Sequence, residues 1–511
     1  MLAKVRSGAV LGVDAFAVEI EVHAGRGDPA TIVVGLPDAA VKESKDRVHT
    51  ALINSGFMPP RGRTTINLAP ADVKKEGPSF DLPIALGMLV AEEELAPGRL
   101  EDLCALGELA LSGEIRRVRG VLPIAMEARA AGCRGLLVPE DNAEEAAVVE
   151  GLPVYPVRTL RQAADFLAGT LVLEPHRLDA RAVFDQASHG EEDFADVKGQ
   201  ESAKRAFEVA VAGGHNILTL GPPGTGKTML ARRVPSILPP MTLDEALETT
   251  KIHSIAGVLA SHQALVAQRP FRAPHHTVSD AGLLGGGSHP MPGEVSLSHN
   301  GVLFLDELPE FHRNVLEVLR QPLEDGQVTI SRAAASVTFP SRFMLVAAMN
   351  PCPCGYFGDT RKECRCSPIQ IERYRHRISG PLLDRIDIHV EVPAVAYTEL
   401  SRAGPGEPSA AIRERILRAR EIQRKRFEGA RRVYCNALMR SRDIHKHCPV
   451  EDEAQHLLKM ALTELHFSAR TYDRILKVAR TIADLDGSET LKTPHVSEAI
   501  QYRSLDRRYW V

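Results

Sequence analysis

The 511-residue sequence contains no stretch of about 18 apolar residues, so no membrane-spanning helix is expected. We expect residues 1–20 to form a first strand and not a secretory signal, because Asp14 interrupts the apolar stretch after Lys4 and Arg6 and no small-residue cleavage site follows. We therefore expect a cytoplasmic protein, in which the eight cysteines are reduced or bound to metal.

The chain lacks a large excess of charge of either sign, since its net charge at pH 7 is −4. This value excludes a generally basic protein that coats nucleic acid, but it leaves room for a local positive channel. The hydrophobic content of 44% and the charged content of 25% are ordinary for a soluble globular protein. More than one domain is expected, because single cores rarely grow past about 250–300 residues.

The sequence pattern predicts three folded regions and one linker. Residues 1–168 alternate short apolar runs with amphipathic stretches, which predicts a compact α/β domain. Residues 169–193 lose this periodicity and are predicted to form a linker. Residues 194–393 carry the buried-strand runs and motifs of a second α/β core. Residues 394–511 contain a cluster of glycine and proline near their start and then a helical pattern, which predicts a C-terminal helical lid.

A glycine-rich motif follows the apolar run at residues 217–220. It fits the pattern G-x-x-x-x-G-K-[ST] with the residues Gly221, Pro222, Pro223, Gly224, Thr225, Gly226, Lys227 and Thr228. Glycines in such a loop allow backbone N–H groups to turn toward phosphates, and the helix that begins there adds the positive end of its dipole. We expect Lys227 to reach the β and γ phosphates of ATP and Thr228 to hold Mg²⁺.

A second apolar run, residues 301–305, ends in the carboxylates of Asp306 and Glu307. We expect Asp306 to coordinate Mg²⁺ and Glu307 to activate the attacking water. Together the two motifs predict an ATPase whose core is an αβα sandwich with a parallel sheet, in the order of an AAA+ module.

Three further residues complete the predicted catalytic set. Asn350 ends the apolar run at residues 343–349, where a polar side chain can orient the water against the γ-phosphate. Arg385 ends a helical turn near an expected subunit boundary, where an arginine can neutralise charge on a neighbour's γ-phosphate. Arg470 opens a helix of the lid, from which it can contact the nucleotide. The alternatives are an asparagine that caps a turn and arginines that pair with surface acids. The nearest competing arginines are Arg377 and Arg474.

Three stretches of the core carry a family resemblance. They are residues 269–276 (RPFRAPHH), 350–355 (NPCPCG) and 378–385 (ISGPLLDR). With them the sequence resembles, over nearly its whole length, the magnesium-chelatase-like AAA+ proteins of the YifB/ComM type. The resemblance implies a homo-oligomeric ATPase that forms a hexameric ring.

The resemblance also implies two functions from different classes. In the ComM branch it implies a DNA helicase that promotes branch migration of recombination intermediates during natural transformation. Related chelatase subunits instead use the ring to drive metal insertion into a porphyrin. The favoured interpretation is a motor that binds branched, single-stranded or duplex DNA, and the alternative is a chelatase-like subunit that remodels a protein partner.

Two segments of the core are candidates for DNA contact. Residues 328–332 and 336–339 are predicted to form a hairpin, and its tip would place Arg332 against phosphate without reading sequence. A surface hairpin with one solvated arginine is the alternative. The glycine-rich residues 282–287 are predicted to form either a second pore-facing loop or a flexible connector. The histidines at 275 and 276 are expected to pack or cap more readily than to bind metal. The arginine-dense helix from 413 to 432 is expected to be a solvated, ion-paired face.

Four cysteines form a C-x-C-x₉-C-x-C pattern in a segment rich in glycine and proline. They are Cys352, Cys354, Cys364 and Cys366. Four thiolates can satisfy tetrahedral Zn²⁺, and a short irregular loop otherwise lacks a core to order it. Structural zinc is the favoured interpretation and unliganded loop cysteines are the alternative, since the spacing departs from C-x₂-C.

The N-terminal domain resembles the Lon protease domain through residues 77–83 (GPSFDLP), 112–115 (SGEI) and 121–124 (VLPI). In Lon-type proteases the serine at the position of Ser79 is the nucleophile and a later lysine is its base. No lysine occurs between Lys75 and Lys198, so the base is missing. We expect Ser79 to be a helix cap or turn residue, and the domain to be a non-proteolytic scaffold for assembly or DNA binding.

Overall fold

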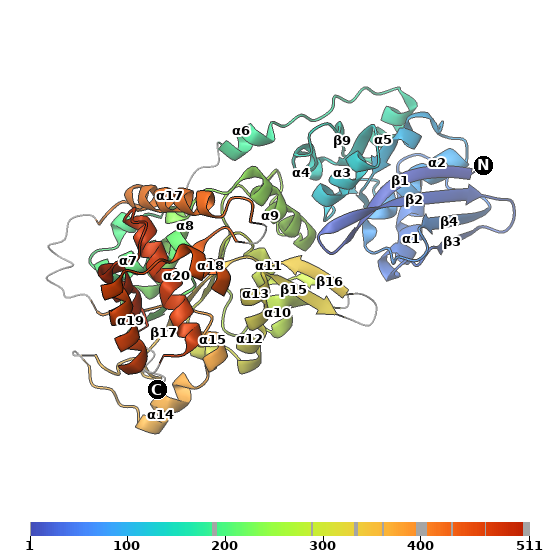
Figure 1. The fold of residues 1–511 in the computed structure, drawn as a ribbon. Helices are drawn as coiled ribbons and strands as arrows, with labels where there is room; N and C mark the ends of the chain where they lie inside the picture. The colour runs from blue at the N-terminus through green and yellow to red at the C-terminus, as the bar shows by residue number, and fades with distance from the viewer. Residues whose placement is uncertain are drawn as a thin grey trace.

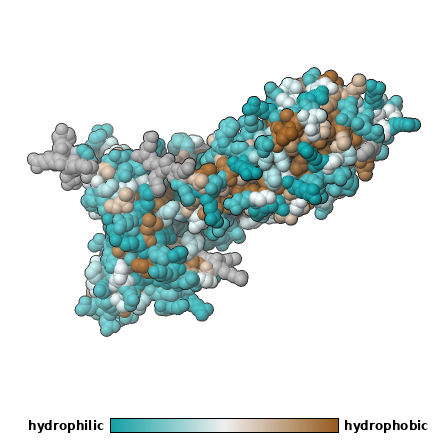
Figure 2. Space-filling view, turned by 90° about the horizontal axis from the view of Figure 1, so that it is seen from above, coloured by the Kyte–Doolittle hydropathy of each residue, from teal (hydrophilic) through white to brown (hydrophobic). Residues whose placement is uncertain are grey.

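The computed structural model describes residues 2–185, 192–287, 290–331, 336–359, 362–394, 406–430, 433–464 and 467–503. The molecule has two lobes, with the N-terminal α/β domain at one end and the parallel-sheet domain with the C-terminal helices at the other (Figure 1). Seen from above, the surface is mainly hydrophilic, with smaller hydrophobic patches on both lobes (Figure 2). Within the described ranges, no helix has both the length and the apolar character that a membrane span requires.

The N-terminal lobe is built on a seven-stranded mixed sheet with the order β3-β4-β2-β1-β5-β8-β9. β1 and β2 form a long antiparallel hairpin, whereas β5, β8 and β9 are parallel. The strands are β1 (Leu2–Leu11), β2 (Asp14–Ala24), β3 (Ala30–Val34), β4 (Arg63–Ala69), β5 (Leu103–Ala105), β8 (Gly135–Pro139) and β9 (Val154–Val157), with the short pair β6 (Glu108–Leu109) and β7 (Ile115–Arg116) beside them. The helices are α1 (Ala39–Asn54), α2 (Asp81–Ala91), α3 (Val121–Ala130), α4 (Ala143–Ala147) and α5 (Leu160–Ala168). The predicted α/β class is confirmed. Every residue of α2 is buried, which explains why the sequence of this helix is apolar on nearly all sides.

The N-terminal lobe docks on α9 (Leu243–Ala256) of the second lobe. Ser254 Oγ on α9 donates to the carboxylate of Glu145, and the backbone N–H of Gly120 donates to the carbonyl of Ser254 at 3.2 Å. Apolar side chains of both lobes share one buried cluster beside these bonds. The contact therefore combines apolar burial with hydrogen bonds that satisfy the buried polar groups.

The segment between the lobes contains one short helix among its described residues, α6 (Ala180–Asp185). Ala180 is buried in the cluster between the lobes. This packing explains the local order in a segment whose sequence shows no periodicity.

The second lobe contains a five-stranded, all-parallel sheet with the order β11-β14-β17-β10-β18. Its strands are β11 (Phe271–Arg272), β14 (Val302–Leu305), β17 (Met344–Met349), β10 (Ile217–Leu220) and β18 (Ile388–Glu391). Alternate residues of β14 enter two different cores, Val302 and Phe304 on one side and Leu303 and Leu305 on the other. Both faces of the sheet are therefore covered, which confirms the predicted αβα sandwich and explains the continuous apolar strand runs.

One face of this sheet packs against α7 (Glu201–Gly213), α8 (Lys227–Ile237) and the C-terminal helices, which share a single core with it. The C-terminal helices are α17 (Ser409–Arg426), α18 (Ser441–His447), α19 (Asp452–Glu464), α20 (Ala469–Leu485) and α21 (Thr493–Gln501). Asp484 is fully buried between Arg426 and Arg480 and accepts hydrogen bonds from both guanidinium groups. Removing that carboxylate would leave two buried cations unpaired, so this triad fixes how α17 meets α20.

The arginine-dense helix is α17, and the expectation of a solvated face is right for only part of it. Arg424 pairs with Glu421 at 2.9 Å on the exposed side. Arg413 and Arg420 instead donate to the carbonyls of Ser236 and Val211 near the ends of α8 and α7. The inward arginines satisfy helix-terminal carbonyls that packing removes from water.

The other face of the sheet carries short helices and two hairpins. The hairpins are β12 (Gly285–Gly286) with β13 (Met291–Pro292), and β15 (Gln327–Ser331) with β16 (Ser336–Pro340). The second one confirms the predicted strand pair, and Arg332 between its strands lies outside the described residues. The helices are α10 (Asp280–Leu284), α11 (Glu294–Leu297), α12 (Arg313–Val318), α13 (Arg320–Asp325), α14 (Pro368–Arg375) and α15 (Gly380–Leu383).

Candidate active site

The glycine-rich loop joins β10 to α8 in a conformation that its glycines allow. Gly224 and Gly226 have φ values of 77° and 93°, which a residue with a side chain adopts only with strain. A Cβ on Gly221 would lie 2.2 Å from the carbonyl oxygen of Val392, so there is no room for a side chain. α8 begins at Lys227 directly after Gly226, so the unpaired N–H groups of its first turn lie at the loop.

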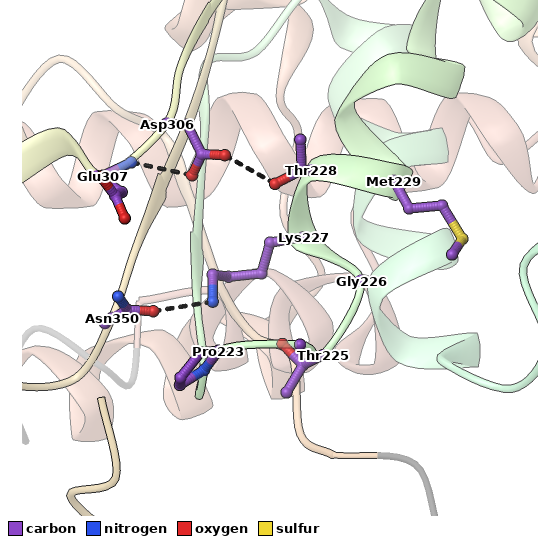
Figure 3. A pocket seen from close by; sticks show the side chains of 10 residues that line it. Pro223, Thr225, Gly226, Lys227, Thr228, Met229, Asp306, Glu307 and Asn350 are labelled. Atoms are coloured by element: carbon purple, nitrogen blue, oxygen red, sulfur yellow. Dashed lines mark hydrogen bonds between the residues drawn. The ribbon is translucent and has the colours of Figure 1, made fainter. Parts of the chain in front are cut away.

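A cavity of about 430 Å³ lies beside this loop. Its walls come from the loop, from the end of β14 and from the end of β17 (Figure 3). The lining residues are Pro223, Gly224, Thr225, Gly226, Lys227, Thr228, Met229, Asp306, Glu307 and Asn350. Of the motif residues predicted to bind nucleotide, all but Gly221 and Pro222 line this cavity, together with Met229, which the motif does not specify.

Lys227 is held by neutral oxygens at the base of the cavity. Its ammonium group donates to the carbonyls of Gly221 at 2.7 Å and Pro222 at 2.9 Å and to Asn350 Oδ1 at 3.1 Å. Burial lowers the pKa of Lys227 to about 8, against the opposing effect of Asp306 and Glu307. The ammonium group can exchange these neutral oxygens for charged phosphate oxygens, which interact with it more strongly.

The side-chain oxygens of Thr228 and Asp306 lie close enough together to share one Mg²⁺. Thr228 Oγ1 donates to Asp306 Oδ2 at 2.7 Å. Adjacent ligands of an octahedral Mg²⁺ with bonds of about 2.0–2.1 Å lie about 2.9 Å apart, so the two oxygens fit one coordination sphere. The other oxygen of Asp306 accepts from the backbone N–H of Glu307 at 2.9 Å, which fixes the carboxylate.

Glu307 directs its carboxylate away from the core. Its backbone is left-handed, with φ 52° and ψ 47°, and its side chain is 53% exposed. A left-handed non-glycine residue costs about 1–3 kcal/mol and is characteristic of functional sites. His276 Nδ1 lies 3.6 Å from Glu307 Oε2. The predicted base therefore has a histidine neighbour that motif analysis did not connect to it.

Neither of the two predicted arginines lines the cavity in the described chain. The guanidinium group of Arg385 donates to the carbonyl of Pro381 and pairs with Glu324, and its side chain is 12% exposed. Arg470 is 78% exposed and lies 4.0 Å from Asp384, the residue before Arg385. Each competing arginine pairs with its own acid, Arg377 with Glu310 and Arg474 with Asp387.

The backbone at Arg385 is held by residues that the sequence analysis did not single out. Asn216 Nδ2 donates to the carbonyl of Arg385 at 2.9 Å, and Asn216 Oδ1 accepts from the N–H of Leu345 at 2.8 Å. His215 is fully buried and contacts Asp387 at 2.8 Å. Polar side chains directly before the apolar strand β10 are the signal that could have identified them. Asn216 and His215 connect β10, the strand before the glycine-rich loop, to the segment around Arg385.

The four-cysteine loop begins directly after Asn350 and forms one cluster. All four sulfur atoms lie within 4.8 Å of one another, and three separations among them are 3.3, 3.6 and 3.7 Å. Zinc–sulfur bonds of about 2.3 Å give a tetrahedron with edges of about 3.8 Å, so the donor set fits Zn²⁺. A Cβ on Gly355 would lie 2.6 Å from Pro223, so this loop packs directly against the glycine-rich loop.

Ser79 lies in the N-terminal lobe, in a 3₁₀ turn (Pro78–Phe80) directly before α2. Its carbonyl accepts from the N–H of Gly107 at 3.0 Å. Since no side chain caps α2, Ser79 is a turn residue and not a helix cap.

Comparisons with known proteins agree with these features. Residues 20–142 match the family model "Subunit ChlI of Mg-chelatase", residues 193–400 match "Magnesium chelatase, subunit ChlI", and residues 406–503 match "Magnesium chelatase, subunit ChlI C-terminal". The chain is 48% identical over 510 residues to competence protein ComM of Haemophilus influenzae, covering 99% of this chain and 98% of that protein. It is 46% identical over 510 residues to the uncharacterized protein YifB of Escherichia coli, with the same coverage. A partial match, 31% identical over 154 residues, joins 27% of this chain to 26% of Lon protease 2 of Bacillus subtilis.

We expect nucleotide affinity to fall as the pH rises through about 8, the pKa of Lys227. Below that pH the lysine already carries the charge that phosphate needs, and above it binding must take up a proton. The affinity for a non-hydrolysable ATP analogue with Mg²⁺ should therefore drop about ten-fold between pH 7 and pH 9 in a fluorescence titration.

Lys227→Arg is the matched control, because a guanidinium group stays charged over this range. Its affinity should change little with pH, whatever its absolute value. Equal pH slopes for the two proteins would contradict this account of Lys227.

Proposed function

Because the chain belongs to the magnesium-chelatase-like AAA+ family of the YifB/ComM type, we propose that it is a ring-forming ATPase that moves branched DNA. Its proposed role is branch migration of recombination intermediates in natural transformation. The observation that carries this proposal is the match to the competence protein, which extends over 99% of this chain and so includes both hairpins.

The proposed hydrolysis uses residues from three neighbouring strand ends. Lys227 binds phosphate oxygens, and Thr228 and Asp306 hold Mg²⁺, which supplies positive charge against the phosphates. Glu307 accepts the proton of the attacking water, and Asn350 orients that water. Glu307 and Asn350 follow adjacent strands and line one cavity, which supports their acting on the same water.

We propose that Arg385 completes the nucleotide site of a neighbouring subunit and that Arg470 contacts the nucleotide from the helical lid. Arg470 lies beside Asp384, so one region of the surface carries both arginines. In an assembled ring, Arg385 would exchange Glu324 for the neighbour's γ-phosphate, a contribution of about 10³-fold or more in comparable reactions. This assignment gives the ring a chemical reason to form, because no arginine lines the nucleotide cavity among the described residues.

The proposed DNA contact is the hairpin formed by β15 and β16, with Arg332 against phosphate. Thr329 Oγ1 lies 2.9 Å from Thr338 Oγ1, and Ser331 Oγ lies 3.0 Å from Ser336 Oγ. These cross-strand hydrogen bonds hold the two strands together up to the residues that flank Arg332. Phosphate contact of this kind gives affinity for any DNA sequence, as a motor requires.

We also propose that the four-cysteine cluster binds one structural Zn²⁺. Four thiolate ligands leave no open coordination position, so the metal would have no direct role in catalysis. The cysteine loop packs against Pro223, which supports a role for the zinc in fixing the cysteine loop beside the nucleotide cavity.

The DNA motor is tested by measuring ATP turnover without DNA, with single strands, with linear duplex and with a four-way junction. We expect the junction to stimulate turnover, and its strands to separate only when ATP can be hydrolysed. Lys227→Ala is the blank, because it removes the phosphate-binding cation.

ATP turnover that none of the DNA substrates stimulates would contradict the proposed DNA motor. That result would favour the chelatase-like subunit acting on a protein partner, and stimulation by such a partner would be the next measurement.

Zinc is tested by elemental analysis of the purified chain. We expect about one zinc per chain, and loss of most of it in Cys354→Ser because a three-thiolate site holds the ion more weakly. Cys133→Ser is the matched control, since Cys133 lies outside the cluster and should leave the zinc content unchanged. A native chain without zinc, whose four cluster thiols all react with a thiol reagent, would contradict the assignment.

A further inference from the structure

Two polar residues directly before β10 hold the segment that begins at Arg385. Asn216 Nδ2 donates to the carbonyl of Arg385 at 2.9 Å. The backbone carbonyl of Asn216 accepts from the N–H groups of Asp387 and Ile388, each at 3.1 Å. His215 Nδ1 lies 2.8 Å from Asp387 Oδ2. Main-chain and side-chain bonds therefore fix the same four-residue segment.

The residues that hold this segment are themselves fixed. The other end of the Asn216 amide, Oδ1, accepts from the N–H of Leu345 at 2.8 Å. His215 is fully buried, and its Nε2 lies 2.8 Å from Thr481 Oγ1 on α20. Because both ends of the Asn216 amide are bonded to backbone, its side chain cannot turn without breaking two hydrogen bonds.

The guanidinium group of Arg385, in contrast with its backbone, meets a partner that it can exchange. It pairs with Glu324, whose side chain is 59% exposed, and donates to the carbonyl of Pro381. Among the described residues, its buried Nε has no hydrogen-bond partner. Arg385 therefore combines an anchored main chain with a side chain whose bonds are incomplete within its own subunit.

We propose that Asn216 is a positioning residue for Arg385. Its amide fixes the carbonyl of Arg385, so that the guanidinium group of this arginine meets the γ-phosphate of the neighbouring subunit in a productive place. A misplacement of about 1 Å can lower a rate by about 10²-fold, so one backbone hydrogen bond at this point has a large effect. This inference deepens the proposed function and rests on it, because it requires sites that are shared between subunits.

The test substitution is Asn216→Asp, which keeps the acceptor for Leu345 and removes the donor to Arg385. The kcat for ATP should fall about ten-fold, since a displaced arginine stabilises the transition state less well. The KM for ATP should stay within about two-fold of the native value, because the lost interaction acts in the transition state. The matched control is Asn54→Asp in the N-terminal lobe, which also removes an amide donor to a backbone carbonyl, that of Leu111 at 2.7 Å. This variant should turn over ATP at the native rate.

Mixtures of subunits then show in which site Asn216 acts. Asn216→Asp mixed with Lys227→Ala should exceed the sum of its parts, because an intact nucleotide cavity meets an intact Arg385 at some boundaries. Asn216→Asp mixed with Arg385→Ala should not exceed it, because every boundary then has a displaced or missing arginine. The reference mixture, Lys227→Ala with Arg385→Ala, shows separately whether sites are shared.

A gain of turnover with Arg385→Ala would place Asn216 in the nucleotide site of its own subunit and would overturn the proposal. A gain with neither partner, or a native kcat in Asn216→Asp, would also overturn it. A reference mixture without any gain is a failure of the shared sites in the proposed function, and the inference fails with it. A gain in the reference mixture together with a failure of the Asn216→Asp mixtures overturns the inference alone.

Discussion

Parallel pairing of β10, β17 and β14 is the constraint on which the site depends. The register sets Leu220 beside Met349 and Leu305 beside Ala347, so the three strands end at one edge of the sheet. The glycine-rich loop, Asp306 with Glu307, and Asn350 each follow one of these ends, and side chains far apart in the sequence therefore line one cavity. A shift of register in any of these strands would separate Lys227 from Glu307.

The same sheet connects the nucleotide site to the surface that carries the arginines. Asn216 bonds both to the start of β17 and to the carbonyl of Arg385, and His215 contacts Asp387. On the opposite side of the sheet, His276, which follows β11, contacts Glu307, which follows β14. Each connection is a small set of polar contacts between neighbouring elements.

The parts of the site that the sequence predicted are local patterns. The phosphate loop and the carboxylates after β14 can be recognised because each function requires fixed spacing within one loop or strand end. The pairing of Arg385 with Glu324 and of His276 with Glu307 could not be predicted, since their partners come together only through the order of strands and helices. The inward arginines of α17 could not be predicted either. The helix is so densely charged that its sequence does not show which residues face α7 and α8. Burial of Ala180 likewise orders part of the linker without a periodic sequence.

The central claim is that each ATP site is completed by an arginine from the next subunit. Its most direct test mixes Lys227→Ala subunits with Arg385→Ala subunits and measures ATP turnover against each variant alone. If sites are shared, each variant alone is nearly inactive, and the mixture regains turnover at boundaries where an intact Lys227 meets an intact Arg385. A mixture no more active than the sum of its parts would contradict the claim and would place all catalytic groups within one chain.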